Sequence, residues 1–405
     1  MSCCTSKANH NVRQLVNVAK RFKTSPSHTR GQRSLASSST STSTTITTQD
    51  ATTPKIIFSG IQPTGVPHLG NYLGALQQWK RMQDSASPST KLLFSIVDLH
   101  AITVPRSASI LRQQKREMLA ALLAVGLDPS RCTIFYQSSV PAHSELQWIL
   151  SCTASTGYLS RMTQWKSKLS LSDSATVSSA SAALKHGLFS YPILQAADIL
   201  VHRATHVPVG ADQRQHLEFA RECVTNFNSS WGTDALVQPE TILASSEEGA
   251  RVMSLADPEK KMSKSDANHG SRVLITDDAG SVLAKFKKAK TDDLQSAGIG
   301  YDKSARPGVA NLLEILAAFS EAKQSAEEIA KDFREEGVNY KELKERTAKA
   351  VIKGLEGVRE RYLDLLDGDG NGKRLDEIAE EGGRKARASA EETMKAVRAA
   401  VGLGV

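Results

Sequence analysis

Short apolar segments alternate with longer amphipathic segments from about residue 55 onward. A short apolar run predicts a buried strand, and a longer segment with apolar residues at i, i+3 and i+4 predicts a helix. The predicted strands are 55–59, 92–97 and 133–137, and the predicted helices are 71–82, 107–125, 144–156, 188–201 and 210–225. Strands that alternate with helices at this spacing favour right-handed crossovers and a parallel sheet with helices on both faces. The pattern therefore predicts an α/β fold with a Rossmann-like parallel sheet.

Helical periodicity continues from Ala279 onward, as in Leu312, Leu313, Leu316 and Phe319. This pattern predicts a second, α-helical domain at the C-terminal end of the chain. The stretch 166–183 is rich in Ser and Ala and has few large apolar residues, so we expect a flexible insertion there. We therefore expect a Rossmann-like domain at 51–265 and a helical domain at 266–405.

The first part of the chain differs from the rest in its charge. Residues 1–49 hold seven Lys and Arg side chains and no acid, whereas the whole chain has a net charge of +8. Apolar residues around 12–22 fall on one helical face, and Ser and Thr dominate 34–48. This composition is typical of a mitochondrial transit peptide, and a disordered tail is a second interpretation compatible with the first. We expect residues 1–50 to direct the protein to the mitochondrial matrix.

Composition also limits which kinds of partner we expect for the chain after residue 49. Without the seven leading cations its net charge is +1, so an RNA-binding surface on it would be a local basic patch. The five cysteines lack the C-x-x-C or Cys/His spacing of a zinc site, and we expect neither a structural metal nor a disulfide. No apolar stretch reaches the roughly 18 residues that a membrane-spanning helix needs, so we expect no membrane partner.

Two segments carry most of the candidate chemistry. The first is a Gly-rich turn between an apolar strand and a helix, Phe58-Ser-Gly-Ile-Gln-Pro-Thr-Gly-Val-Pro-His68-Leu-Gly-Asn71. Its backbone N–H groups and the helix N-terminus would face a polyphosphate. The second, Lys260-Lys-Met-Ser-Lys-Ser265, would bring lysines to the same charge, although a lysine run taken alone is more often a solvated surface. The P-loop pattern G-x-x-x-x-G-K-[ST] does not occur, so a nucleoside triphosphate would be bound in another way.

These two segments resemble the paired signatures of class I aminoacyl-tRNA synthetases. The residues His68-Leu-Gly-Asn71 are similar to the H-I-G-H element, and Lys261-Met-Ser-Lys-Ser265 matches K-M-S-K-S letter for letter. Five further segments resemble the tryptophanyl members of that family, namely 60–65, 97–103, 161–166, 191–198 and 207–213. The similarity runs from about residue 55 to the C-terminus.

The resemblance implies an enzyme that uses ATP with Mg²⁺ to activate L-tryptophan as its adenylate and then transfers the tryptophanyl group to tRNA(Trp). It also implies a homodimer, a catalytic role for 51–265 and anticodon recognition by 266–405. The tyrosyl members are the nearest alternative, because they share both motifs and the arrangement Tyr191-x-x-x-Gln-x-x-Asp198. A synthetase-derived RNA-binding factor and a nucleotidyltransferase built on the same ATP site are further alternatives.

Amino-acid activation needs no nucleophile from the protein, because the substrate carboxylate attacks the α-phosphorus of ATP and pyrophosphate leaves. The protein instead stabilises the charge that builds up on the phosphate oxygens. The resemblance gives this role to Lys261 and Lys264, with Lys168 as a candidate third cation beside the Ser-rich stretch. His68 would donate an imidazole N–H to a phosphate oxygen, or would simply stand at a helix start.

The residues that we expect around ATP lie in both motifs and near the predicted strand ends: Gln62, Pro63, Thr64, Gly70, Asn71, Gly210, Ala211, Asp212, Val252, Lys261, Met262, Ser263, Lys264 and Ser265. Gly70 would admit the adenine ring because it has no Cβ. Thr64 could instead cap a turn, Asn71 the helix, and Val252 could pack in a core. Ala211 departs from the family, which usually has Glu at this ribose-side position.

The residues that we expect around tryptophan are Asp198, Phe58, Gly60, Val97, His100, Gln195 and Gln213. Asp198 would accept a hydrogen bond from the indole N–H, which leaves a buried charge unpaired when phenylalanine enters. Its apolar neighbours argue against an exposed carboxylate. Gln213 would orient the α-amino group, and Gln195 stands where many bacterial tryptophanyl enzymes have Met. For Phe58 and Val97, packing in the sheet core is an equal interpretation.

Overall fold

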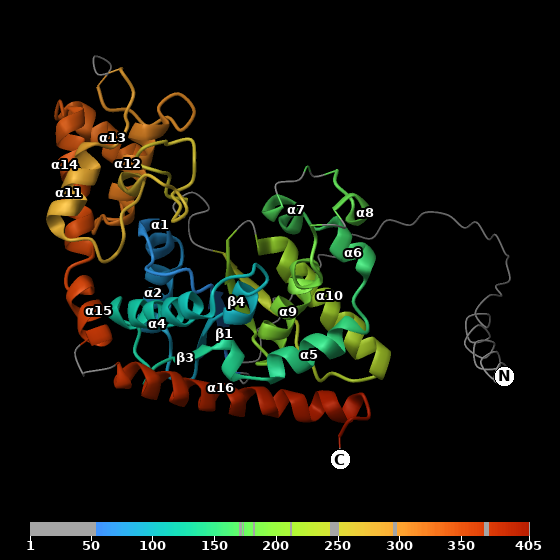
Figure 1. Ribbon diagram of the computed structural model, residues 1–405. Helices are drawn as coiled ribbons and strands as arrows, with labels where there is room; N and C mark the ends of the chain where they lie inside the picture. The colour runs from blue at the N-terminus through green and yellow to red at the C-terminus, as the bar shows by residue number, and fades with distance from the viewer. Residues whose placement is uncertain are drawn as a thin grey trace, which may run out of the picture. The chain divides into compact units, whose positions relative to one another are not determined.

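A parallel sheet forms the centre of the computed structural model. Its strands are β1 (Ile56–Ile61), β2 (Lys91–Ile96), β3 (Thr133–Tyr136), β4 (His206–Val209) and β5 (Glu240–Leu243). They form one five-stranded sheet in the order β3-β2-β1-β4-β5, with all neighbours parallel (Figure 1). The structure describes residues 54–169, 172, 174–180, 183–210, 213–243, 251–294, 298–367 and 372–404, so the predicted transit segment lies outside it. The predicted α/β class is confirmed.

The three predicted strands are confirmed with ends shifted by one or two residues. In the register of the first pair, Ile56 lies beside Lys91 and Ile61 beside Ile96. The sequence pattern does not predict β4 and β5, because neither is a continuous apolar run: β4 contains His206 and Pro208, and β5 begins with Glu240 and Thr241. A proline within a short run argues against a strand, and a run that is half polar gives no strand signal.

The helices of this part follow the predicted pattern, but several are divided. They are α1 (Leu69–Asn71), α2 (Gln77–Ser85), α3 (Asp98–Ala101), α4 (Ala108–Ala124), α5 (Ala142–Ser151), α6 (Thr156–Arg161), α7 (Gln164–Lys168), α8 (Val177–Ala180), α9 (His186–Leu200) and α10 (Arg214–Trp231). A π-helical segment at Tyr72–Leu76 joins α1 to α2, and short 3₁₀ turns occupy Gln137–Ser139 and His269–Ser271. Two short helices, α7 and α8, lie in or beside the stretch that we predicted to be a flexible insertion.

The path of the chain through the sheet reverses once. From β1 it passes to β2 and β3 on one side, and it then returns through α5 to α9 to place β4 on the other side of β1. In open parallel sheets of this kind the crevice for a ligand lies at the carboxyl ends of the strands, where the order reverses. The topology therefore places a binding site between the ends of β1 and β4.

The helical part predicted after residue 266 comprises α11 (Ala279–Lys287), α12 (Pro307–Ala318), α13 (Ala326–Glu335), α14 (Tyr340–Gly354), α15 (Val358–Asp367) and α16 (Lys373–Ala400). Helices α11 to α14 share one apolar core, which also contains Val252 and Met262. Helix α15 packs on α4, whereas α16 runs along β3 and α5 (Figure 1). The division at residue 265 remains a prediction about function. None of the helices that the structure describes is long and apolar enough to cross a membrane.

Helix α16 lies unusually close to the edge strand of the sheet. A Cβ atom on Gly382 would stand 1.8 Å from the carbonyl oxygen of Ile134 in β3, a separation that no side chain can occupy. Ala386 and Ala390 follow at intervals of four residues on the same helix face, and both are completely buried. Small residues on one face of α16 therefore let its backbone approach β3, and the helix covers that edge of the sheet.

Candidate active site

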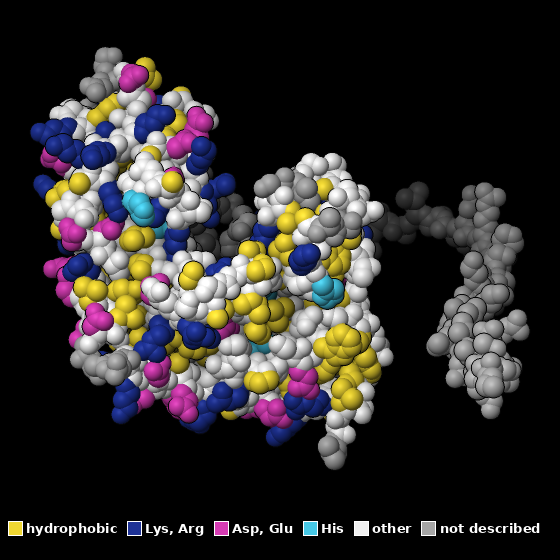
Figure 2. All heavy atoms as spheres, in the orientation of Figure 1, with side chains coloured by type: hydrophobic (Ala, Val, Ile, Leu, Met, Phe, Trp, Pro, Cys, Tyr) yellow, Lys and Arg dark blue, Asp and Glu magenta, His cyan; other side chains and the backbone are white. Residues whose placement is uncertain are grey.

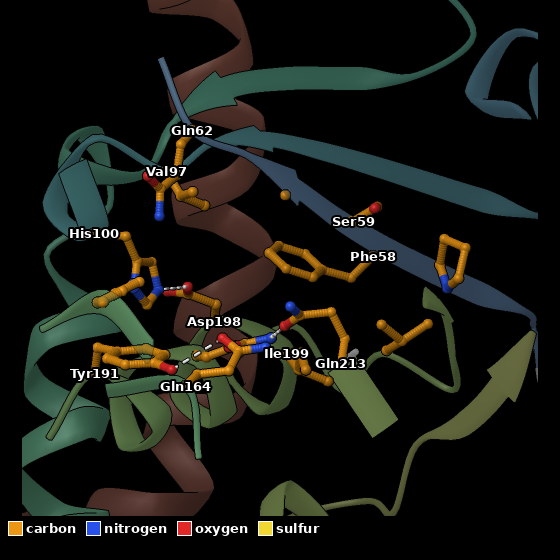
Figure 3. A pocket seen from close by; sticks show the side chains of 15 residues that line it. Phe58, Ser59, Gln62, Val97, His100, Gln164, Tyr191, Asp198, Ile199 and Gln213 are labelled. Carbon is orange, nitrogen blue, oxygen red and sulfur yellow. Dashed lines mark hydrogen bonds and ion pairs between the residues drawn. The ribbon is translucent and has the colours of Figure 1, made fainter. Parts of the chain in front are cut away.

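A cavity of about 410 Å³ opens at the point where the strand order reverses (Figure 3). Strands β1 and β4 supply one wall, and α9 supplies another. All seven residues predicted for the tryptophan site line it: Phe58, Gly60, Val97, His100, Gln195, Asp198 and Gln213. Two residues predicted for ATP and phosphate, Gln62 and Lys168, line it as well.

Asp198 is the charged centre of the cavity wall, and its side chain is 2% exposed. Its Oδ2 accepts a hydrogen bond from His100 Nε2 at 2.9 Å, as Figure 3 shows. Its Oδ1 accepts from His143 Nδ1 at 2.7 Å, and the amide of Gln137 donates to both oxygens, at 2.7 and 2.9 Å. The Gln137 oxygen accepts from the Leu99 backbone N–H at 3.0 Å, which fixes the amide with its NH₂ group towards Asp198.

Asp198 is ionised in this setting. Burial alone would raise its pKa, but the hydrogen bonds from His100 and His143 outweigh burial and hold the pKa well below its usual value. Each carboxylate oxygen already accepts two hydrogen bonds. Gln137 and His143 are completely buried behind it, whereas His100 lines the cavity. A ligand N–H that reaches Asp198 would therefore share or replace the bond from His100.

Several other side chains that line the cavity are polar. Tyr191 Oη lies 3.0 Å from Gln164 Oε1 and 3.0 Å from His216 Nε2, and the Gln195 amide donates to Gln213 Oε1 at 3.2 Å. The ammonium group of Lys168 lies 4.2 Å from the centre of the Tyr191 ring, and burial lowers its pKa. These partners give a zwitterionic ligand both donors and acceptors.

Sequence reasoning missed six residues that line this cavity, namely Ser59, Gln164, Tyr191, Ile199, Val207 and Pro208. The signal for Tyr191 was available, because residues 191, 195 and 198 stand at i, i+4 and i+7 on α9 and so share one helix face. Gly60 is required by space, since a Cβ there would stand 2.9 Å from Val97 Cγ1. Phe58 belongs to an apolar core and also lines the cavity, so its core packing is confirmed, whereas its contact with tryptophan stays a prediction.

His68 stands at the start of α1 as its N-cap residue. Its Nδ1 accepts from the Asn71 backbone N–H at 3.3 Å, and the Asn71 side chain accepts from the His68 N–H at 3.2 Å. Burial, with Lys264, Lys261 and Arg272 nearby, lowers the pKa of His68 to about 4, so the ring is neutral at pH 7. With Nδ1 accepting, the single proton sits on Nε2. The cap therefore orients the ring and leaves an N–H available to a phosphate.

The second motif packs directly against the first. The Leu69 N–H donates to the Val273 oxygen at 2.8 Å, and the Ile275 N–H donates to the Pro67 oxygen at 3.0 Å. Lys264 Nζ donates to the Thr64 oxygen at 3.1 Å, to Thr64 Oγ1 at 3.1 Å and to the Gly65 oxygen at 2.8 Å. Segments about 200 residues apart in sequence thus form one surface.

The two motif lysines differ in their surroundings. Burial lowers the pKa of Lys264 to about 8, against an opposing effect of Glu117. Lys261 is exposed. Lys264 is therefore a partly dehydrated cation held over the Gly-rich turn, whereas Lys261 is free to approach a ligand from solvent.

Of the other residues predicted around ATP, some are buried in the core of the helical part and others bond to each other. A Cβ on Gly70 would stand 3.6 Å from Val252 Cβ, so these two residues adjoin each other. Val252 and Met262 are buried in the core of the helical part, and a contact of Met262 with ATP would use its backbone. The hydroxyls of Ser263 and Ser265 bond to each other at 2.9 Å.

Four more residues complete the predicted ATP set. Pro63 offers its carbonyl oxygen to Arg106 at 3.4 Å, and Gly210 accepts from the Gln213 N–H at 3.0 Å. The predicted ribose contacts Ala211 and Asp212 lie outside the described residues.

Comparison with known proteins agrees with this geometry. The family model for class I tRNA synthetases (W and Y) matches residues 50–356. The mitochondrial tryptophan–tRNA ligase of Schizosaccharomyces pombe is 44% identical over 357 residues, which cover 86% of this chain and 96% of that protein.

Two solved structures resemble the fold closely. The tryptophanyl-tRNA synthetase of Mycoplasma pneumoniae has a TM-score of 0.73 and 30% identity, covering 87% of this chain and 99% of that one. The enzyme of Campylobacter jejuni, solved with ADP and tryptophan, has a TM-score of 0.67 and 30% identity, covering 86% of this chain and 100% of that one. Since both motifs, the sheet topology and these matches agree, the chain belongs to the class I tRNA synthetases for tryptophan and tyrosine.

Proposed function

We propose that the chain is a tryptophan–tRNA ligase that works with ATP. The observation that carries the proposal is the cavity at the ends of β1 and β4, where the buried Asp198 carboxylate can accept a hydrogen bond from a ligand N–H. Phe58 and Val97 give the same cavity apolar walls. An indole ring offers that combination, because it is apolar except for one donor.

In the first step the tryptophan carboxylate attacks the α-phosphorus of ATP. A new C–O–P bond forms, the bond to the β-phosphate bridging oxygen breaks, and pyrophosphate leaves with its electron pair. Lys264 and Lys261 stabilise the charge on the phosphate oxygens, and the Nε2 proton of His68 supplies a neutral donor. Lys168 stands at the cavity wall, where it would meet the reacting carboxylate or the α-phosphate.

In the second step a hydroxyl of the terminal ribose of tRNA(Trp) attacks the carbonyl carbon of the adenylate. The ester forms, AMP leaves, and the hydroxyl proton is released. On the face drawn in Figure 2, Lys and Arg side chains gather over helices α11 to α14. Exposed lysines of this part include Lys287, Lys288, Lys341 and Lys349. Such a local basic surface supports a contact of 266–405 with the tRNA backbone.

Three further statements complete the proposal. Mg²⁺ enters as the ATP complex, because the ion neutralises the triphosphate. The enzyme works as a homodimer, as the family resemblance implies. It acts in mitochondrial translation, in the matrix, as the composition of residues 1–50 and the likeness to a mitochondrial ligase of fission yeast support.

The test is amino-acid-dependent exchange of pyrophosphate into ATP, measured on the full chain with each of the twenty amino acids. We expect exchange with tryptophan alone. Exchange with tyrosine would instead assign the chain to the tyrosyl branch, and folded protein without exchange for any amino acid would contradict the enzymatic proposal.

A further inference from the structure

Two completely buried imidazoles stand behind Asp198, on the side away from the cavity. His143 and His202 are 0% and 1% exposed, and neither lines the cavity. His143 Nδ1 lies 2.7 Å from Asp198 Oδ1, and its Nε2 lies 3.3 Å from His202 Nε2. The other nitrogen of His202, Nδ1, lies 3.2 Å from Ser389 Oγ on α16. Ser389 on the C-terminal helix is thus connected through His202 and His143 to the carboxylate of Asp198.

When both imidazoles are neutral, the chemistry of these groups gives every bond of this chain one direction. A carboxylate can only accept, so His143 must carry a proton on Nδ1. A neutral His143 then accepts at Nε2, which requires the proton of His202 to sit on its Nε2. His202 Nδ1 is left as an acceptor and takes the hydroxyl proton of Ser389. The hydrogen bonds therefore run in one direction: Ser389 donates to His202, His202 donates to His143, and His143 donates to Asp198.

The surroundings of His202 favour the neutral ring that this order requires. Burial is the largest effect on His202 and lowers its pKa well below its usual value, against an opposing effect of Asp198. The ring stacks on Phe58 at 5.9 Å between centroids and meets Phe135 edge-on at 5.5 Å. Because Phe58 lines the cavity, His202 also supports that wall directly.

We propose that His202 and Ser389 are positioning residues for amino-acid selection, which act by fixing the proton of His143 on Asp198 and thereby the orientation of the carboxylate. This inference rests on the proposed function, since it concerns the carboxylate assigned to the indole N–H. It makes α16 a part of the amino-acid site, although no residue of α16 lines the cavity among the residues that the structure describes.

The helix provides a matched control. Thr393 lies one turn beyond Ser389 on α16, is 1% exposed, and its hydroxyl has no hydrogen-bond partner within the described residues. Ser389→Ala and Thr393→Val each remove one hydroxyl from the same helix, but only the first removes a member of the chain. His202→Phe removes the central donor while keeping a ring of similar size between Phe58 and Phe135.

The experiment measures pyrophosphate exchange at varied tryptophan and at varied ATP on the full chain. We expect the KM for tryptophan to rise about tenfold in His202→Phe and about threefold in Ser389→Ala, as the loss of one buried hydrogen bond predicts. The KM for ATP should stay within about twofold in both variants. Thr393→Val should leave both constants unchanged. Equal rises of both KM values, or equal effects of Thr393→Val and Ser389→Ala, would overturn the positioning role.

A second measurement is made on the wild-type protein and needs neither enzymatic activity nor a folded variant. In protein labelled with ¹⁵N-histidine, the ring nitrogen shifts should show protons on His143 Nδ1 and His202 Nε2. A proton on His143 Nε2 would overturn the inferred direction. If the wild-type chain activates tyrosine instead of tryptophan, the proposed function fails, while the nitrogen shifts still decide whether the chain of hydrogen bonds exists.

Discussion

Lys264 Nζ donates to three oxygen atoms of the first motif. These bonds hold its ammonium group over the Gly-rich turn, so we expect its contribution to be larger in the transition state than in binding. We expect Lys264→Ala to slow adenylate formation at least 100-fold, about 2.7 kcal/mol, with the tryptophan affinity nearly unchanged.

Lys260 is the matched control for that measurement. It lies four residues earlier, its side chain is 79% exposed, and it pairs with Asp257 at 2.8 Å. Lys260→Ala should leave single-turnover adenylate formation within about twofold of wild type, as expected for an exposed ion pair. Equal losses of the rate of adenylate formation in the two variants would contradict a special role of Lys264.

The pKa of Lys264 predicts how ATP capture depends on pH. Because burial lowers this pKa to about 8, the free enzyme loses the ammonium charge as the pH rises through about 8. The value of kcat/KM for ATP should fall over that interval, whereas kcat should hold to higher pH, since bound phosphate raises the pKa again. In Lys264→Arg the fall near pH 8 should disappear, because guanidinium stays charged. An unchanged fall in that variant would assign the titration to another group.

Asp198 tests the assignment of the amino-acid cavity. Asp198→Asn keeps the shape but replaces one acceptor by a donor, which then faces donors from Gln137, His100 and His143. We expect kcat/KM for tryptophan to fall about 100-fold, with a much smaller change for phenylalanine, which has no ring N–H to pair. The two values come from competing exchange assays, and parallel losses would contradict the role of Asp198 as the indole acceptor.

At the residue scale the sequence predicted what lines the cavity better than what stands behind it. The seven predicted residues lie in segments that match a known pattern, so each has a neighbour in sequence to mark it. Gln137 and His143 reach Asp198 across 61 and 55 residues, and no spacing rule links them to it. Gln137 lies in the turn after β3 and His143 in α5, and only the packing of these elements against α9 brings them to Asp198.

Helix α16 shows the same limit at the scale of an element. Its periodic apolar positions predict that a helix forms and which face is buried. They do not say what covers that face, and we assigned 266–405 to one helical domain, whereas α16 packs on β3 and α5. The Gly382-Gly383 pair was the available hint, because glycine inside a helix usually marks a close approach.

Gly382→Ala tests that close approach. The added Cβ would stand 1.8 Å from the Ile134 oxygen, so the helix or the strand must move. We expect the free energy of unfolding to fall by about 3 kcal/mol in urea titrations, despite the better helix propensity of alanine.

Gly187→Ala in α9 serves as the control, since no atom of the described residues beyond the adjacent backbone lies within 4 Å of its added Cβ. It should be neutral or slightly stabilising, as alanine usually is in a helix. Equal stability of the two variants would show that α16 does not depend on Gly382.

For the whole molecule, the uneven charge predicts that the leading segment and the rest of the chain serve different functions. The seven leading cations lie outside the part that the structure describes, and the rest of the chain is close to neutral. Deleting residues 1–50 should therefore leave pyrophosphate exchange unchanged and abolish uptake by isolated mitochondria. Uptake of the shortened chain would contradict the transit role, and a loss of exchange would place these residues in the folded enzyme.

The lysine motif is built into the helical part of the molecule. Met262 lies in the core of α11 to α14, its N–H donates to Val252 at 3.0 Å, and Asn311 of α12 holds both backbone groups of Met253. Separating them would expose apolar surface and break paired backbone groups, at a cost of several kcal/mol. Lys264 lies only two residues after Met262, so a displacement of α11 to α14 would also displace the ammonium group that is proposed to meet the phosphates.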